Sequence, residues 1–201
     1  MINNIKEKDI LKFIKEKEDH RILIPSIFEQ FTNSILPELR NLCDMACENN
    51  LNVYQLAGAK NLSAANAITR TYNTKLGLLW ERIANLAPNV TSPELDFGVK
   101  IPEVDVIVLY ESNLYYTQLK TQKNTLTGSQ GKRTVSELTA FKHHWFVACI
   151  ETNASWTAPK KLNRLFGRQF WSKINIDYET DIIPNLKKSI SAVNTLIANN
   201  N

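Results

Sequence analysis

Two short apolar runs separated by a polar turn occupy the middle of the chain. Residues 104–109 are rich in β-branched side chains, and residues 114–119 are mostly aromatic, apolar or β-branched. The turn at 111–113 is Glu-Ser-Asn. Such runs, bounded by turn-forming residues, predict a β-hairpin. A third apolar run, 145–150, has the length of a strand that is buried on both faces.

Around the hairpin, apolar residues recur at the spacing of amphipathic helices. The predicted helices cover residues 4–19, 61–86, 136–144, 160–166 and 181–198, and another begins at Pro37. The polar stretches 89–98 and 121–134 are predicted to be loops, with a short strand over 97–101. The order strand, strand, strand, helix, strand predicts an α/β core with helices before and after it.

We expect a single domain over residues 1–201. Within it, residues 1–75 are expected to form a helical N-terminal layer, residues 76–175 the core that carries the site, and residues 176–201 a C-terminal helix. The hydrophobic content of 43% and the charged content of 22% are those of an ordinary globular protein.

No feature of the sequence indicates export or a membrane. No apolar run approaches the roughly 18 residues that a membrane span needs. The N-terminus has no apolar signal-peptide segment, and the 3 cysteines lack the spacing of a disulfide framework or a zinc ribbon. We therefore expect a cytoplasmic protein without a membrane segment.

Charge is distributed unevenly along the chain. Residues 81–111 contain six acids and two bases, whereas residues 112–173 contain ten bases and two acids. An acidic segment followed by a long basic one indicates a cation site beside a surface that binds a polyanion. The alternative is a chance fluctuation of surface charge.

The hairpin carries polar side chains that are unusual in a buried sheet. Asp105 is expected inside the first strand, and Gln118 and Lys120, two residues apart, project from one face of the second. A carboxylate and a backbone carbonyl are oxygen ligands that Mg²⁺ accepts, so Asp105 and the carbonyl of Leu119 are candidate ligands. Glu81, near the end of the preceding helix, is a candidate outer or second ligand.

These residues also have purely structural interpretations. Glu81 could instead contact a helical neighbour or Arg82, and Asp105 and Lys120 could form a buried salt bridge. As a functional group, the Lys120 ammonium could polarise an attacking water or stabilise the charge of a phosphoryl transition state.

Asp105 followed after a hairpin by Gln118-Leu119-Lys120 resembles the PD-(D/E)xK nuclease superfamily, in its QxK variant. The sequence departs from the pattern because Glu103 and Val104 separate Pro102 from Asp105, and because Gln118 stands where an acid is usual. The segments Tyr-Tyr-Thr-Gln-Leu-Lys-Thr-Gln-Lys-Asn-Thr-Leu from position 115 and Gly-Arg-Gln-Phe-Trp from position 167 are similar to segments of type II restriction endonucleases.

The resemblance implies a restriction-endonuclease-like mixed central β-sheet flanked by helices, with a helical N-terminal layer. It implies a type II restriction endonuclease that depends on Mg²⁺, hydrolyses double-stranded DNA at a specific short sequence and acts as a homodimer. The implied catalytic residues are Asp105, Gln118, Lys120 and Glu81, with Asp105, the Leu119 carbonyl and Glu81 holding the metal.

Basic and amide side chains after the hairpin are the candidate DNA contacts. Arg and Lys read guanine, Asn and Gln read adenine, and the Arg and Lys side chains also bind phosphate. These candidates are Lys123, Asn124, Gln130, Lys132, Arg133, Lys160, Lys161, Arg164 and Arg168. Two alternatives remain open at this point: a non-catalytic DNA-binding protein with a degenerate nuclease core, and a nuclease that depends on DNA structure or modification.

Overall fold

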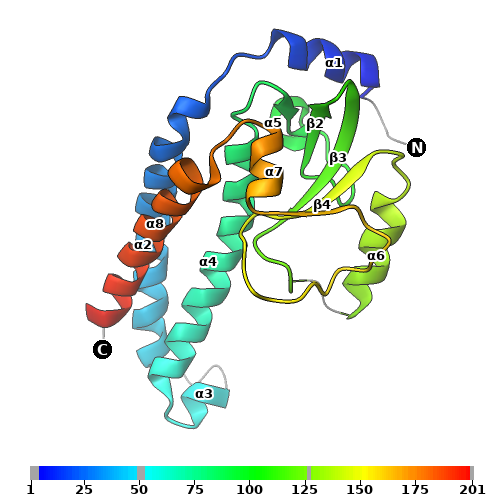
Figure 1. Cartoon of the computed structure of the whole chain (residues 1–201). Coiled ribbons are helices and arrows are strands. Elements are labelled where there is room, and N and C mark those ends of the chain that lie inside the picture. The colour runs from blue at the N-terminus through cyan, green and yellow to red at the C-terminus, as the bar shows by residue number, and fades with distance from the viewer. Residues whose placement is uncertain (1–4, 49–52, 126–127, 200–201) are drawn as a thin grey trace.

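The computed structural model describes residues 5–48, 53–125 and 128–199 as a mixed α/β fold (Figure 1). The helices are α1 (Glu7–Glu16), η1 (Arg21–Leu23), α2 (Ile24–Glu48), α3 (Val53–Leu56), α4 (Lys60–Ala84), α5 (Pro93–Phe97), α6 (Gly128–Leu138), α7 (Arg168–Lys173), η2 (Tyr178–Ile182) and α8 (Ile183–Asn199). The strands are β1 (Val90–Thr91), β2 (Val106–Tyr110), β3 (Asn113–Lys120), β4 (His144–Ala148) and β5 (Arg164–Phe166).

The strands form one mixed sheet in the order β1-β2-β3-β4-β5. The pairs β1–β2 and β2–β3 are antiparallel, whereas β3–β4 and β4–β5 are parallel. The predicted hairpin is confirmed as β2 and β3, with Ile107 opposite Tyr116. The crossover that parallel strands require between β3 and β4 contains α6.

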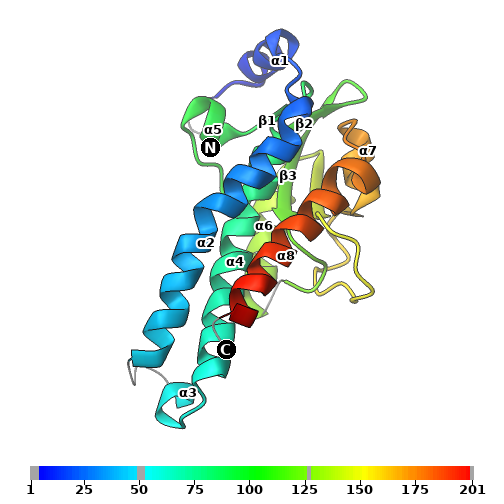
Figure 2. The same cartoon turned by 90° about the vertical axis from the view of Figure 1, so that its left-hand side faces the viewer.

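One face of the sheet packs against long helices. Helix α4 lies against the sheet, and α2 packs along both α4 and α8 (Figures 1 and 2). The indole rings of Trp80 on α4 and Trp171 on α7 meet edge to face, with centroids 6.1 Å apart, in the centre of this core. Val106 and Val108 of β2 point into it.

The opposite face of the sheet forms a second core beneath α6 and α1. Ile107 of β2 points to this side because side chains alternate along a strand, and it packs with Phe146 of β4 and Leu138 of α6. Ile10 and Ile14 of α1 close the same cluster. The chain is therefore a mixed sheet covered by helices on both faces, as the sequence predicts.

The prediction that a new helix begins at Pro37 is wrong, because α2 runs continuously through this residue. A proline inside a helix removes one backbone hydrogen bond. The apolar face of α2 nevertheless continues on both sides of it, with Ile35 and Leu39 buried. Burial along the whole face outweighs the loss of one bond.

The boundaries predicted after the hairpin are also wrong. Helix α6 begins at Gly128, inside the predicted loop 121–134, and ends at Leu138 instead of continuing to 144. The polar composition of this segment indicates a loop, but burial of Thr134 and Leu138 against the sheet stabilises the helix. The helix cannot continue because His144 pairs with Tyr116 at the start of β4.

The predicted helix over 160–166 is wrong, since residues Arg164–Phe166 form β5. They pair with Phe146–Ala148 of β4. Because this partner is distant in the sequence, the periodicity of residues 160–166 alone does not indicate the pairing. The predicted loop 89–98 likewise contains β1 and α5, and the short strand over 97–101 is replaced by an isolated bridge between Ile101 and Val104.

Among the helices of the described residues, none has the length and hydropathy required to cross a membrane.

Candidate functional site

Asp105 lies one residue before β2, where the hairpin ladder ends, and not inside the strand as predicted. Its backbone N–H donates to the carbonyl of Thr117 at 2.9 Å. Its carboxylate oxygen Oδ2 accepts the backbone N–H of Leu119 at 2.6 Å. The side chain of Asp105 therefore takes the place of a strand carbonyl just before the start of β2. No described residue donates a hydrogen bond to its other oxygen, Oδ1.

The carbonyl of Leu119 faces the same side of β3 as Asp105. In a strand, the N–H and C=O of one residue point to the same neighbour, and successive residues alternate. The Leu119 N–H points to Asp105, whereas the next carbonyl, that of Lys120, accepts the N–H of Cys149 on the β4 side at 2.7 Å. The Leu119 oxygen thus lies beyond the start of β2 and next to the Asp105 carboxylate.

A cavity of about 370 Å³ joins this end of the hairpin to α4. It brings together Glu81, Asp105, Leu119 and Lys120, which the sequence predicted as one site. The remaining lining is mostly polar and uncharged, and consists of Asn73, Thr74, Gly77, Leu78, Thr121, Gln122 and Thr125.

Glu81 reaches the cavity from the last turns of α4, and a serine holds its carboxylate. Ser92 Oγ donates to Glu81 Oε1 at 2.5 Å and accepts the N–H of Leu95, so it also caps α5. Sequence reasoning missed Ser92, although Ser-Pro-Glu is a recognisable helix start. The Glu81 carboxylate is thus hydrogen-bonded to the N-cap residue of α5, in the segment between β1 and β2.

Burial shifts the pKa of both acids of the cavity upward. Burial raises the pKa of the Asp105 carboxyl above its ordinary value, opposed by the Leu119 N–H and the nearby Lys120 ammonium. Burial likewise raises the pKa of Glu81, opposed by its hydrogen bond from Ser92. Lys120 is partly buried, and within the described part of the chain its Nζ forms no hydrogen bond and no ion pair. The structural alternative of an Asp105–Lys120 salt bridge is therefore not seen.

We expect Asp105→Asn to be more stable than the wild type at pH 7.5 in the absence of divalent cations. The raised pKa means that the folded protein holds this proton more tightly than the unfolded chain does. Wild-type stability therefore falls as the pH rises from the unfolded pKa of about 3.9 through the folded one, by about 1.4 kcal/mol for each tenfold difference in proton affinity between the two states. Asparagine keeps an acceptor for Leu119. Urea denaturation at pH 7.5 and pH 3.5 measures the difference, which should disappear at the lower pH.

The exposed hairpin residue Glu111 provides the control, since Glu111→Gln should change stability little at either pH. A lower stability of Asp105→Asn at pH 7.5 would contradict the prediction, because it would show that the carboxylate is paired and charged in the folded protein.

The oxygen atoms at the cavity suit Mg²⁺ better than a metal held wholly by protein. Within residues 5–48, 53–125 and 128–199, no three His, Cys, Asp or Glu side chains are close enough to share a metal ion. Mg²⁺, however, typically takes one or two carboxylates and completes its shell with waters and substrate phosphate. Asp105 Oδ1 and the Leu119 carbonyl meet that requirement, and Glu81 lines the same cavity.

Gln118 does not line the cavity, although the sequence placed it in the site. It is 4% exposed and its amide Nε2 donates to Glu103 Oε2. Sequence reasoning missed Glu103, because it treated this residue only as an interruption between Pro102 and Asp105. Its position two residues before Asp105 was the available signal.

The candidate DNA contacts divide into engaged and exposed side chains. The Lys123 ammonium lies 4.1 Å from the centroid of the Phe166 ring and donates to a backbone carbonyl, and Arg168 pairs with Glu151 and Glu179. The guanidinium of Arg164 lies 5.5 Å from an indole ring. Arg133 Nε lies 3.4 Å from Glu103 Oε1. The side chains of Asn124, Gln130, Lys132, Lys160 and Lys161 are exposed.

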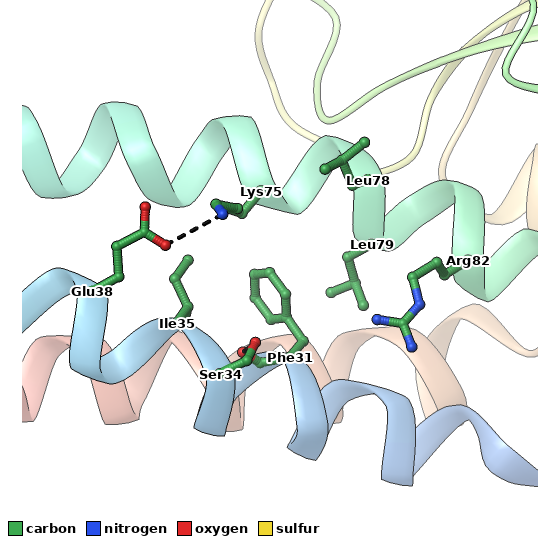
Figure 3. A pocket seen from close by; sticks show the side chains of 8 residues that line it. All are labelled: Phe31, Ser34, Ile35, Glu38, Lys75, Leu78, Leu79 and Arg82. Carbon is green, nitrogen blue, oxygen red and sulfur yellow. Dashed lines mark hydrogen bonds and ion pairs between the residues drawn. The ribbon is translucent and has the colours of Figure 1, made fainter. Parts of the chain in front are cut away.

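A second cavity, of about 270 Å³, lies between α2 and α4 (Figure 3). It differs from the Asp105 cavity in the pairing of its acid. Its acid, Glu38, is paired with Lys75 at 3.3 Å across the two helices. Phe31 and Ile35 form its floor. With its acid paired and both carboxylate and ammonium half exposed, this cavity offers no chemistry comparable to that around Asp105.

No family model, no curated protein and no solved structure matches this chain.

Proposed function

We propose that the protein is a Mg²⁺-dependent type II restriction endonuclease that hydrolyses double-stranded DNA at a specific short sequence. One observation carries the proposal. Glu81, Asp105, Leu119 and Lys120, which come from a helix, from the residue before β2 and from the end of β3, line one cavity. Neither of its two acids, Glu81 and Asp105, forms an ion pair with a described residue, and neither does the Lys120 ammonium beside them.

In this proposal the acids hold the cation and the lysine acts on the phosphate. Asp105 and the Leu119 carbonyl would bind Mg²⁺, with Glu81 as a third oxygen donor, directly or through water. Bound Mg²⁺ would neutralise phosphate charge and acidify a water. The Lys120 ammonium would orient the attacking water and stabilise the negative charge that develops as a water–phosphorus bond forms and a phosphorus–ester bond breaks. The leaving oxygen takes a proton, giving a phosphomonoester and a hydroxyl.

The exposed basic and amide residues after the hairpin would hold the DNA. Lys132 and Arg133 lie on α6, and Lys160 and Lys161 lie in the segment before β5. Such contacts make affinity fall steeply with salt. We also propose a homodimer, since two copies would present one cavity to each strand of a palindromic site.

Digestion of a sequenced, unmethylated plasmid tests the function. We expect discrete fragments with Mg²⁺, mapped ends that share one short sequence, and no cutting when EDTA is present or when Asp105 is replaced by alanine. Fragments that arise only from methylated DNA would instead identify a modification-dependent nuclease. No cutting of any DNA with Mg²⁺ or Mn²⁺ would overturn the proposal.

A second candidate is a DNA-binding protein with a degenerate nuclease core. The lack of a three-acid cluster among the described side chains and the amide at position 118 favour it. It predicts salt-dependent DNA binding that Asp105→Ala leaves unchanged, without cleavage under any divalent cation. Any cleavage that depends on Asp105 excludes it.

A further inference from the structure

Gln118 has a buried oxygen without a hydrogen-bond donor. Its side-chain Oε1 is one of four buried side-chain atoms of the described chain that have no partner. The residue is 4% exposed and lies on β3, two residues before Lys120. A buried acceptor left unpaired costs about 1 to 3 kcal/mol, so such an atom in a folded protein calls for an explanation such as a bound ion or water.

Glu103 determines which end of the Gln118 amide is left unpaired. The amide Nε2 donates to Glu103 Oε2. The reversed amide would put its oxygen against the carboxylate, where two acceptors repel each other. The orientation with the oxygen directed away from Glu103 is therefore the only one that the contact allows.

Glu103 is in turn held by α6. Thr134 Oγ1 donates to the same oxygen, Oε2, at 2.9 Å, and Arg133 Nε lies 3.4 Å from Oε1. The Glu103 side chain is 16% exposed, whereas that of Arg133 is 68% exposed. Two residues of α6 thus also contact the carboxylate that accepts the Gln118 amide.

The backbone at Glu103 is also unusual. Glu103 follows Pro102 in a turn closed by the hydrogen bond from Val104 N–H to the Ile101 carbonyl, and its φ is +58°. A type II turn has this arrangement, and glycine or asparagine normally occupies the position with positive φ. Glu103 adopts a conformation that costs a residue with a side chain of order 1 to 2 kcal/mol, which agrees with a role for its side chain.

Asp105 lies beside Gln118 on the hairpin. Asp105 bonds to Thr117 through its N–H and to Leu119 through its carboxylate, and these two residues flank Gln118 on β3. Because Val106 pairs with Thr117, the register of the hairpin places Asp105 opposite Gln118, so that their side chains project from the same face of the sheet. The neutral oxygen that lacks a donor thus belongs to the residue across from the carboxylate that the proposed function assigns to the cation. Amide oxygens are accepted ligands of hard divalent cations.

We propose that Glu103 is a positioning residue of the cation site. It holds the Gln118 amide so that oxygen, and not nitrogen, is presented on the side of Asp105. Gln118 then supplies a neutral oxygen donor in place of a second strand carboxylate. This inference rests on the proposed function, because it concerns the same cation.

Reversing the hydrogen bond tests the proposal. Binding of Mn²⁺ alone is titrated at pH 7.5 by electron paramagnetic resonance, which needs no DNA and no cleavage. We expect Glu103→Gln to lower the affinity by about 10-fold or more, as is typical when a group that orients a ligand is lost. We expect Gln118→Glu alone to bind more weakly than the double variant, because it places two carboxylates together.

The double variant Glu103→Gln with Gln118→Glu reverses donor and acceptor and should bind Mn²⁺ at least as tightly as the wild type. Glu111→Gln on the same hairpin is the control and should have wild-type affinity. If Glu103→Gln lowers thermal stability but leaves Mn²⁺ affinity unchanged, the contact is only structural and the proposal is overturned. A double variant that binds no better than the single variants overturns it too.

Asp105→Ala separates the failure of this inference from that of the proposed function. If Asp105→Ala abolishes Mn²⁺ binding and Glu103→Gln does not affect it, only the role of Glu103 is wrong. If Asp105→Ala binds Mn²⁺ as the wild type does, the proposed cation site itself is wrong, and the inference fails with it.

Discussion

Lys120→Ala should reduce the rate of DNA cleavage by about 1,000-fold while the fold and the binding of Mn²⁺ are retained. Lys120 contributes the ammonium of the Asp105 cavity, and no described residue neutralises it. A positioned charge that stabilises a transition state or moves a proton is worth about 10²- to 10⁴-fold in rate. Single-turnover cleavage of a plasmid at saturating protein measures the chemical step separately from DNA binding.

Lys142→Ala is the matched control, because Lys142 is an exposed lysine of the same basic segment but does not line the cavity. It should cleave at the wild-type rate. Lys120→Arg keeps a positive charge and should retain part of the activity. It should not retain all of it, because the planar guanidinium of arginine is larger than an ammonium. A rate of Lys120→Ala within about two-fold of the wild type would show that this side chain has no part in the reaction.

Gly167→Ala should destabilise the protein by about 2 to 4 kcal/mol. Gly167 has a φ of +41°, a conformation that costs a residue with a side chain about 1 to 3 kcal/mol. A Cβ at this position would also collide with the Glu151 side chain, whose Cδ would lie 2.9 Å away and whose Cγ would lie closer still. Overpacking of this kind adds about 1 to 3 kcal/mol. Urea denaturation of wild type and variant measures the difference.

Gly77→Ala is the matched control for the same substitution. Gly77 lies inside α4, and a Cβ there meets no atom within 4 Å. Removing a glycine from a helix interior should stabilise the protein by about 1 kcal/mol. Opposite signs at the two positions would confirm that backbone conformation and close approach, and not the loss of glycine as such, determine the effect. Equal stability of Gly167→Ala and wild type would contradict the prediction.

The elements with a strong local pattern were predictable, and those that depend on a distant partner were not. The β2–β3 hairpin, β4, α4 and α8 each carry apolar periodicity that is nearly sufficient to specify them. β5 was missed because Arg164–Phe166 becomes a strand only by pairing with β4. The start of α6 was missed because burial of Thr134 and Leu138 exists only once the sheet has formed.

The same distinction between local and distant determinants applies to the candidate site. The sequence by itself determined the chemical groups and their order: an acid at the first strand of a hairpin, predicted inside that strand and found one residue before it, a lysine at the end of the second strand, and an acid on the helix before them. This is possible because strand alternation and helical spacing are local properties. Only the tertiary structure decided that Glu81, Asp105 and Lys120 share one cavity while the Gln118 amide nitrogen donates to Glu103. That outcome depends on how α4 and α6 pack on opposite faces of the sheet, which brings Glu81 to one end of the hairpin and Thr134 and Arg133 to Glu103.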